Sequence, residues 1–304
     1  MPTGSVPPRR VRFLALDIDG TTIRDDGTVS TAVIDAVGRA RRAGVHVVLC
    51  TGRPYHVGVG GIAAALRLTD DTAPGAIPQA IVNNGSASIS LIEGAVRWER
   101  LVPAMHGRAI VEAIESVGAT PLVEQAPSDG PRMFTWDTRD AHSAARWYAH
   151  AWMRIDDVEP VGRDTLLRTA DRATWIGACG DHDTTKRALD RLSRFAAGPD
   201  PVDLVWSASW LHATAPNHVV GVRPAGVHKA YGLARYAAEF GATLEDGVAV
   251  GDEMNDLEMV CDVGLGIAMG QAPRALKAVA RAIVASNEDD GVVEAIERFV
   301  LPYA

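Results

Sequence analysis

Two aspartates at the end of an apolar run are the first residues of this chain that could do chemistry. Asp17 and Asp19 lie in the stretch LALDIDGTTIRDDG and are followed at once by Gly20 and Thr21. A carboxylate that leaves water loses much of its hydration energy unless a cation or hydrogen bonds compensate it. The pattern therefore predicts a cation, or a set of hydrogen-bond donors, opposite these two carboxylates.

The same motif has two other interpretations. An acidic turn after a strand is common, because Asp and Gly both favour turns, so the motif alone does not establish a site. A calcium-binding loop of the EF-hand type is excluded, because such a loop needs a glycine at its sixth position and a glutamate at its twelfth. Counted from Asp17, the glycine of this chain is the fourth residue and the twelfth is Thr28.

Residues suited to phosphate binding follow a second apolar run and begin a later helix. Thr51 and Gly52 come after VHVVLC and offer a hydroxyl and an unhindered backbone N–H to a phosphate oxygen, although such a pair is often no more than a turn. Lys229 is one of only three lysines among 30 basic residues, and it stands at the start of a predicted helix, where backbone amides favour anions. A solvated lysine at a helix start is the alternative interpretation of that residue.

A second acidic motif, GDEMNDLEM, follows the apolar run GVAV in the last part of the sequence. Asp252 and Asp256 bracket Asn255 there, and two carboxylates supply the oxygen ligands that Mg²⁺ prefers. A helix N-cap alone would need only one aspartate. This motif therefore indicates a metal site more strongly than the other two.

The segments that position these motifs repeat the order strand, helix, strand. Ser30 is expected to cap a helix whose apolar residues recur at helical spacing up to Gly44, a residue typical of a helix end. Continuous apolar strands joined by helices predict a parallel sheet covered on both faces, and we expect the motifs to meet at the carboxyl ends of its strands. Buried strands are predicted over VRFLALD (11–17), VHVVLC (45–50), QAIVNNG (79–85), GVAV (247–250) and AIVAS (282–286), with a closing helix from about Gly291.

The middle of the chain differs in composition from its two ends. The stretch SASISLIEGAVRWER alternates apolar and polar residues on either side of EG, which is typical of a β-hairpin. All seven tryptophans fall in this part of the chain: Trp98, Trp136, Trp147, Trp152, Trp175, Trp206 and Trp210. We therefore predict an inserted α+β domain over 86–212 whose core the tryptophans mostly supply, a catalytic core domain over 11–85 and 213–304, and a flexible tail over 1–10.

Composition argues against several classes of protein. The net charge of −8 gives no general attraction to nucleic acid or to an anionic membrane surface, and no stretch has the length and apolarity of a membrane span. The three cysteines show no metal-binding spacing, so we expect buried free thiols, no disulfide framework and a reducing, cytoplasmic location. The sequence lacks GxxxxGK[ST] and GxGxxG, so it gives no support to an NTP-driven or nicotinamide-dependent enzyme.

The four motifs, taken in order, resemble those of the haloacid dehalogenase superfamily, and in particular its Cof-type phosphatases with a large α+β cap. They are DIDGT, TGR, the lysine at a helix start and GDEMND, and VNNGS, GIAMGQAP and SNEDDGVVEAI are similar to the same subgroup. Gln271 stands where that group commonly has Asn, and His228 and Ala230 flank Lys229 where a small polar residue and Gly are usual. The resemblance implies an α/β fold, with a Rossmann-like parallel-sheet core and an inserted α+β cap domain.

The resemblance also implies roles for the acidic residues. Asp17 would be the nucleophile that forms an aspartyl-phosphate, because a covalent step divides one hard displacement into two easier ones. Asp19 would protonate the leaving oxygen and later deprotonate the attacking water. Mg²⁺ would be held by Asp17, by the backbone carbonyl of Asp19 and by Asp252, with Asp256 completing the metal site.

The same resemblance implies how phosphate is held and what the protein does. The phosphate oxygens, on which charge develops in the transition state, would be bound by Thr51, Gly52, Lys229 and Asn255. The expected activity is Mg²⁺-dependent hydrolysis of a phosphomonoester, with a small phosphorylated metabolite such as a sugar phosphate as substrate. Neither nucleic acid nor a membrane is expected as a partner.

Three other functions stay open as alternatives. A phosphosugar mutase or phosphotransferase on the same core would yield isomerised or transferred phosphate instead of free phosphate. A phospho-accepting signalling domain also combines aspartates, a threonine and a lysine on a parallel sheet, but it needs only about 120 residues and no insert. A catalytically silent binding domain is disfavoured because the acidic groups are intact.

Overall fold

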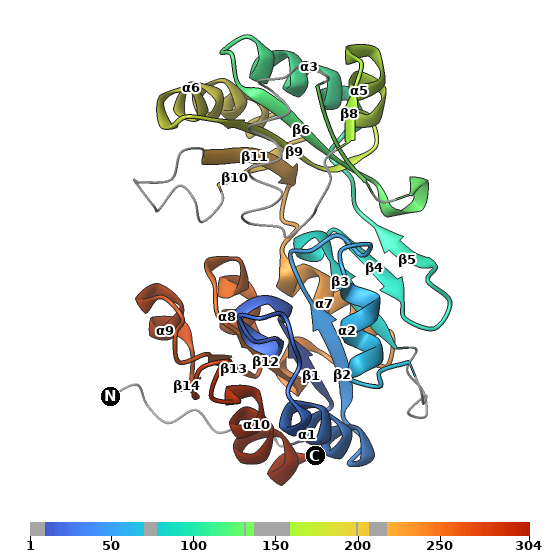
Figure 1. Cartoon of the computed structure of the whole chain (residues 1–304), viewed down its shortest axis with the longest axis vertical. Helices are drawn as coiled ribbons and strands as arrows, with labels where there is room; N and C mark the ends of the chain where they lie inside the picture. The colour runs from blue at the N-terminus through green and yellow to red at the C-terminus, as the bar shows by residue number, and fades with distance from the viewer. Residues whose placement is uncertain (1–9, 70–77, 131, 137–158, 199, 207–217) are drawn as a thin grey trace. The chain divides into compact units, whose positions relative to one another are not determined.

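The computed structural model describes residues 10–69, 78–130, 132–136, 159–198, 200–206 and 218–304. The chain divides into two compact units, the first made of residues 1–52, 58–97 and 228–304 and the second of residues 53–57 and 98–227. Both ends of the chain therefore contribute to one unit, which Figure 1 colours blue to cyan and orange to red.

The first unit is built on an eight-stranded sheet in the order β14-β13-β12-β1-β2-β3-β4-β5. The strands from β14 to β3 run parallel, and β4 pairs antiparallel with β3. The central strand β1 lies between β2 and β12, so the residues that follow these three strands lie at one edge of the sheet. The strands are β1 Phe13–Leu16, β2 His46–Cys50, β3 Gln79–Val82, β4 Ala87–Ser90, β5 Val96–Glu99, β12 Gly247–Gly251, β13 Leu265–Ala268 and β14 Ala282–Ile283.

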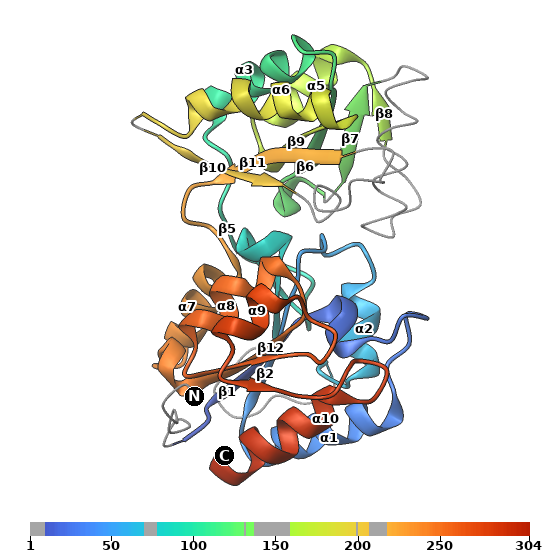
Figure 2. The ribbon, with the colours of Figure 1, turned by 90° about the vertical axis from the view of Figure 1, so that its left-hand side faces the viewer.

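Helices cover both faces of this sheet. Figure 2 shows α7, α8 and α9 on one side of the sheet and α1 with α10 on the other. The helices are α1 Thr31–Arg42, α2 Val59–Ala65, α7 Lys229–Ala238, α8 Leu257–Asp262, α9 Arg274–Val279 and α10 Gly291–Ala295. The predicted parallel sheet with two covered faces is confirmed.

Helix α1 forms where its sequence signals predict. The Ser30 hydroxyl accepts the backbone N–H of Val33 at 3.1 Å, which satisfies one of the donors left open at the helix start. The last turn carries Arg39, Arg41 and Arg42, whose positive charge is favourable at a helix C-terminus. The buried face of the helix consists of Val33, Ala36, Val37 and Ala40. This face lies against β2 and α10.

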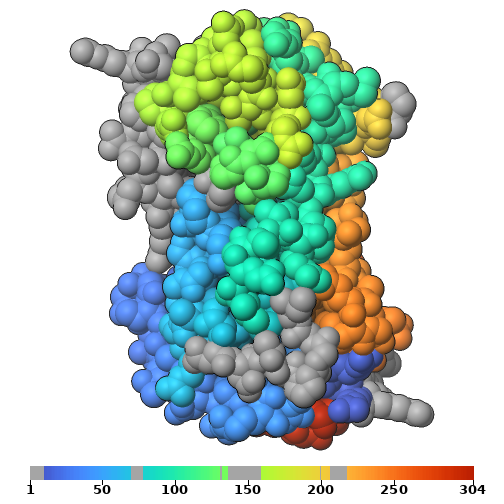
Figure 3. All heavy atoms as spheres, turned by 90° about the vertical axis from the view of Figure 1, so that its right-hand side faces the viewer, coloured from blue at the N-terminus to red at the C-terminus, as the bar shows by residue number. Residues whose placement is uncertain are grey.

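The hairpin predicted from SASISLIEGAVRWER is part of the first unit. Strands β4 and β5 continue the first sheet beyond β3, and the chain passes into the second unit at Trp98. Figure 3 shows this hairpin in turquoise at the surface, and its turn residue Ile92 is 51% exposed. The division between the units thus lies later than residue 86, because pairing with β3 is not visible in the alternation of the hairpin itself. The other expected boundary, at 212/213, is also too early, because residues 218–227 belong to the second unit and the chain returns to the first unit at His228.

The second unit is a six-stranded sheet in the order β10-β11-β9-β6-β7-β8, with helices α3, α5 and α6 along one face (Figures 1 and 2). Strands β7 and β8 are parallel, and the other pairs are antiparallel. The strands are β6 Thr120–Gln125, β7 Met133–Trp136, β8 Glu159–Val161, β9 Ala173–Gly180, β10 Val202–Trp206 and β11 His218–Pro224. The helices are α3 Ala104–Glu115, α5 Arg163–Ala170 and α6 His182–Leu192.

The expectation that tryptophans supply the core of this unit is wrong for Trp98 and Trp175. The buried cluster between sheet and helices is aliphatic, with Phe134 and Phe195 as its aromatic members, and both indoles are only half-buried. Because Ile176 belongs to that cluster and neighbouring strand residues face opposite sides, Trp175 faces away from the helices. Three others lie outside the described residues: Trp147, Trp152 and Trp210.

The cysteines are free thiols, as expected, but not all are buried. Cys50 and Cys179 are buried, and burial raises the pKa of Cys179 to about 12. Cys261, on α8, is exposed, which corrects the expectation for that residue. Within the described residues, no helix combines the length and the apolar character that crossing a membrane requires.

Candidate active site

The turn after β1 brings Asp17 and Asp19 to the edge of the first sheet. The backbone N–H of Asp17 donates to the carbonyl of Val250 on β12 at 3.1 Å, so Asp17 continues the strand ladder. Asp19 follows, half-buried, and Gly20 takes a φ of +68°, a left-handed conformation that costs glycine little. A β-carbon at Gly20 would lie 2.1 Å from Oδ2 of Asp252, so a larger residue here would displace the carboxylate of Asp252.

The turn after β12 is organised by the side chain of Asp256. Its Oδ2 accepts the backbone N–H groups of Asp252 and Glu253, at 2.9 and 3.0 Å. Oδ1 of Asp252 accepts the hydroxyl of Thr21 at 3.0 Å, which ties this turn to the one after β1. The motif GDEMND therefore forms a turn in which one carboxylate holds the backbone and the other lies against the first acidic motif.

Lys229 connects the two acidic motifs. It is the first residue of α7, and its side chain is completely buried, with an exposure of 0%. Its Nζ donates to Oδ1 of Asp17 at 2.6 Å and to Oδ1 of Asp256 at 2.5 Å. The helix is capped by His228, whose Nδ1 accepts the backbone N–H of Tyr231 at 3.3 Å. The interpretation of Lys229 as a solvated surface residue is therefore wrong.

The charges of this cluster shift one another's pKa values. Burial, and then the carboxylates of Asp256 and Asp252, raise the pKa of Asp17 well above its usual range, although Lys229 opposes them. Burial and the charge of Asp256 raise the pKa of Asp252 to about 7. For Lys229, burial alone would lower the pKa, but the carboxylates of Asp17 and Asp256 outweigh it and raise the pKa. Three carboxylates and one ammonium group leave a net negative charge, which favours either a proton or a metal cation.

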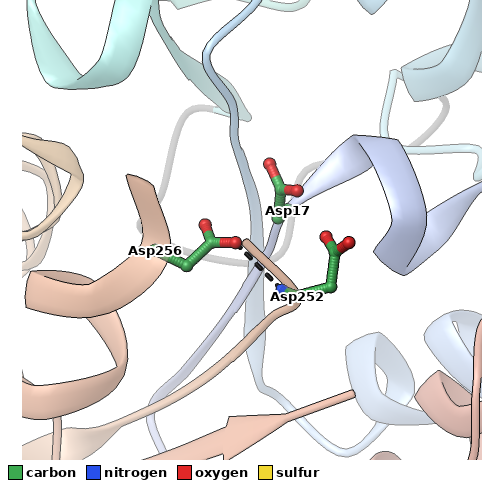
Figure 4. A group of neighbouring side chains, drawn as sticks. All are labelled: Asp17, Asp252 and Asp256. Carbon is green, nitrogen blue, oxygen red and sulfur yellow. Dashed lines mark hydrogen bonds between the residues drawn. The ribbon is translucent and has the colours of Figure 1, made fainter. Parts of the chain in front are cut away.

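These carboxylates fit a divalent cation. One oxygen from each of Asp17, Asp252 and Asp256 lies within 4.8 Å of the others. Figure 4 shows the three side chains gathered where β1 and β12 end, with the hydrogen bond from the N–H of Asp252 to Asp256 dashed. Both oxygens of Asp256 already accept hydrogen bonds, so Asp17 and Asp252 are better suited to direct coordination. A set of carboxylate oxygens suits a hard cation such as Mg²⁺.

The residues predicted to bind phosphate lie beyond the end of β2. Thr51 is buried, and its backbone N–H donates to the carbonyl of Ile81 at 2.9 Å, which places Gly52 just past the sheet. Nδ2 of Asn255 lies 3.2 Å from the point where a β-carbon on Gly52 would stand. Asn255 thus reaches this place from the turn after β12. All the predicted site residues belong to the first unit, on the loops after β1, β2 and β12 and at the start of α7.

Sequence reasoning missed several residues that hold these loops. The hydroxyl of Thr22 donates to the backbone carbonyl of Asp17 at 2.5 Å, and the amide of Gln271 donates to the carbonyl of Gly20. Asn84, after β3, accepts an amide N–H from the turn after β12 at 2.9 Å. Asn84 and Gln271 lie in the motifs VNNGS and GIAMGQAP, but their bonds reach segments far away along the chain, so the motifs alone do not reveal these contacts.

Comparison with known proteins gives consistent matches over most of the chain. A family model described as haloacid dehalogenase-like hydrolase matches residues 14–119 and 210–296. A 5-amino-6-(5-phospho-D-ribitylamino)uracil phosphatase of Bacillus subtilis is 26% identical over 294 residues, which cover 94% of this chain and 97% of that protein. A pyridoxal phosphate phosphatase of Escherichia coli is 26% identical over 289 residues, which cover 94% and 97%. The structure of a haloacid dehalogenase-like hydrolase from Bacteroides thetaiotaomicron superposes on this chain with a TM-score of 0.75 at 24% sequence identity. The superposition covers 95% of this chain and 99% of that one, so the two proteins share a fold.

Proposed function

The chain belongs to the haloacid dehalogenase-like hydrolases and is a phosphatase, and on this premise we propose that it hydrolyses a small phosphorylated metabolite through an aspartyl-phosphate on Asp17. One observation carries the proposal. Asp17 stands at the end of the central strand, 2.6 Å from the buried ammonium of Lys229 and beside the carboxylates of Asp252 and Asp256. An oxygen nucleophile next to a fixed cation and a metal-binding cluster is what phosphoryl transfer requires.

The reaction proceeds in two displacements at phosphorus. An Oδ of Asp17 attacks the phosphorus atom, the bond to the leaving oxygen breaks, and Asp19 donates its proton to that oxygen. In the second step Asp19 takes a proton from water, the water oxygen attacks phosphorus, and the carboxylate of Asp17 is released with inorganic phosphate. Asp19 suits this role because it lies two residues from Asp17, half-buried, in the turn that Gly20 permits.

Several groups of the first unit hold the phosphate and the cation. The hydroxyl of Thr51, the N–H of Gly52 and the amide of Asn255 donate to phosphoryl oxygens, and Lys229 balances their charge. A divalent cation, for which we propose Mg²⁺, would be held by Asp17, by the backbone carbonyl of Asp19 and by Asp252, and it would neutralise the negative charge of the carboxylates and the phosphate. Asp256 supports this set by holding Lys229 and the backbone of the turn.

The substrate class follows from the relatives. The two enzymes named above act on a ribitylaminouracil phosphate and on pyridoxal phosphate, both small phosphorylated compounds. We propose a substrate of the same kind for this chain. The inserted second unit, which their matched lengths also include, is the part that we expect to select among such compounds.

The proposal is tested by phosphate release from a panel of phosphomonoesters. The panel contains hexose phosphates, phosphoglycolate, nucleotides and pyridoxal phosphate, each assayed with and without Mg²⁺. We expect Mg²⁺-dependent release from at least one small ester, and no release by Asp17→Asn. Conversion of a sugar phosphate to its isomer without free phosphate would instead identify a mutase. Undiminished release by Asp17→Asn would contradict the covalent route.

A further inference from the structure

A turn of uncommon backbone conformation lies next to the phosphate-binding residues. Asn83, Asn84 and Gly85 follow β3 with φ values of +53°, +51° and +93°. Asn tolerates this left-handed region better than most residues, but two consecutive side chains there are unusual. Backbone of this kind persists only where the surroundings hold it, and it is concentrated at functional sites.

The surroundings hold this turn from two sides. The backbone N–H of Asn84 donates to the carbonyl of Thr51 at 3.1 Å, which attaches the turn to the end of β2. Gly85 packs on the start of α7 so closely that a β-carbon there would lie 2.1 Å from the carbonyl oxygen of His228. The turn therefore touches both the loop that carries Gly52 and the helix that carries Lys229.

The side chain of Asn84 points to the same place as Asn255. Oδ1 of Asn84 accepts Nδ2 of Asn255 at 2.9 Å. A β-carbon on Gly52 would lie 3.1 Å from Oδ1 of Asn84, 3.3 Å from its Nδ2 and 3.2 Å from Nδ2 of Asn255. Two carboxamides from different loops are thus joined directly over the α-carbon of Gly52.

This arrangement gives Asn84 a donor in the right place. Because Oδ1 of Asn84 accepts the bond from Asn255, its Nδ2 is the group that can donate to an anion. We propose that Asn84 is a phosphate-binding residue: its Nδ2 donates to a phosphoryl oxygen beside Gly52, while its Oδ1 keeps Asn255 in position. The inference rests on the proposed function, since it concerns the phosphate of that same site.

The replacement Asn84→Asp separates binding from a purely structural role. An aspartate keeps the size of the side chain, tolerates the same backbone and still accepts the bond from Asn255, but it exchanges the donor for a negative charge. We expect the inhibition constant of inorganic phosphate, measured with Mg²⁺, to rise at least about 10- to 100-fold, the size typical of a lost hydrogen bond to a charged group. Because the new carboxylate also repels phosphate without any direct contact, the rise counts as the loss of a donor only if the uncharged Asn84→Gly variant, described next, loses affinity as well.

A second pair of variants separates the donor from the strain of the backbone. Asn84→Gly and Asn84→Ala both remove the amide, but alanine is disfavoured in the left-handed region, so it should melt about 2–4 °C below the glycine variant. We expect both to lose phosphate affinity to the same extent. Arg67 is an exposed residue with a φ of +56°, and Arg67→Gly is the matched control that should leave phosphate affinity unchanged.

Calorimetry with inorganic phosphate and Mg²⁺ measures binding without turnover, so the two proposals fail in different ways. Phosphate affinity that is unchanged in Asn84→Asp, or that follows the melting temperature across the Gly and Ala variants, overturns the role of Asn84 alone. A wild-type protein that binds phosphate but releases none from any ester contradicts the proposed function. A wild-type protein that binds no phosphate overturns both.

Discussion

Nζ of Lys229 lies 2.6 Å from Oδ1 of Asp17, and both side chains are buried. The same ammonium lies 2.5 Å from Oδ1 of Asp256, so one cation is shared by carboxylates that follow β1 and β12. A buried pair of this kind contributes little net stability when intact, but the loss of one partner leaves charges without compensation. Lys229 is therefore a residue whose removal should affect folding as well as catalysis.

The replacement Lys229→Met tests this double role. In metal-free protein near pH 8 we expect a loss of about 3–5 kcal/mol in the free energy of unfolding, because Asp17 and Asp256 are left buried without a cation. Urea titration with EDTA present measures the loss. The exposed Lys186 provides the matched control, and Lys186→Met should change stability by no more than about 0.5 kcal/mol. Equal midpoints for the two variants would contradict the buried pair.

The stability of metal-free protein should depend on Asp252 in a defined pH window. The folded pKa of Asp252, about 7, is higher than that of an unfolded chain, about 4, so the folded state holds a proton that the unfolded state has lost. Its contribution to stability is therefore present below pH 4 and is lost as pH rises to about 7. We compare the free energy of unfolding of the wild type with that of Asp252→Asn, both measured in EDTA from pH 4.5 to 8. The wild-type value minus the variant value should fall as pH rises. The side chain of Asp183 is 86% exposed, and Asp183→Asn should show no such slope.

Metal dependence should respond to the same carboxylate. Excess EDTA should abolish activity, and Asp252→Asn should raise the Mg²⁺ concentration for half-maximal rate by about 10-fold or more while the fold is kept. In the wild type the apparent Mg²⁺ affinity should increase from pH 6 to 8, because the proton on Asp252 must leave before the cation binds. Full activity in EDTA would remove the basis for the metal site.

Asp17 and Asp19 should fail in different ways when each is changed to Asn. Asp17→Asn lacks the attacking anion, so no phosphoenzyme should form with any substrate. Asp19→Asn lacks the general acid, which matters less for an aryl phosphate whose leaving group is already acidic, so part of the first step should survive. Single-turnover cleavage of aryl phosphates of graded acidity measures this. Equal losses at every acidity would show that the roles are wrongly assigned.

His228 should act on the reaction through helix α7. Its Nδ1 accepts the N–H of Tyr231, so His228→Ala should remove a cap and cost about 1 kcal/mol of stability, together with part of the catalytic rate, because Lys229 is the next residue. Asparagine is also a good cap, and His228→Asn should restore most of both. Chemical denaturation and kcat together test the effect, with exposed His182→Ala as control. An Asn variant as impaired as Ala would mean that the imidazole does something other than capping.

Much of the site could be predicted because its parts follow apolar strands. Asp17, Thr51 and Asp252 each stand just after such a run, and a parallel sheet places those positions along one edge. The pairing of Lys229 with Asp256 depends on how closely α7 approaches the turn after β12, which no local pattern encodes. The role of Asn84 was not predicted for a different reason. The stretch QAIVNNG is predicted as a strand to its end, whereas the left-handed conformation of its two asparagines depends on contacts with distant segments.

The fold was less predictable where pairing, not periodicity, decides the outcome. The alternation around EG predicted a hairpin correctly, but only its contact with β3 assigns it to the first sheet. The tryptophans marked the inserted segment by composition, yet the register of β9 decides which side chains meet the helices, and there Ile176 takes the place expected of Trp175. Composition therefore indicates where the inserted segment lies, whereas the register of the strands determines which of its side chains form the core.

The central position of β1 has a consequence for synthesis on the ribosome. Asp17 and Lys229 are 212 positions apart in the chain, and β12, the neighbour of β1 on one side, follows later still. At translation rates of about 5–20 residues per second, β1 waits on the order of 10–40 s with the backbone N–H and C=O groups of one edge unpaired. During that interval the nascent chain exposes a template for pairing with other strands. The growing polypeptide should therefore depend on chaperones or on early folding of the inserted unit to stay soluble until β12 emerges.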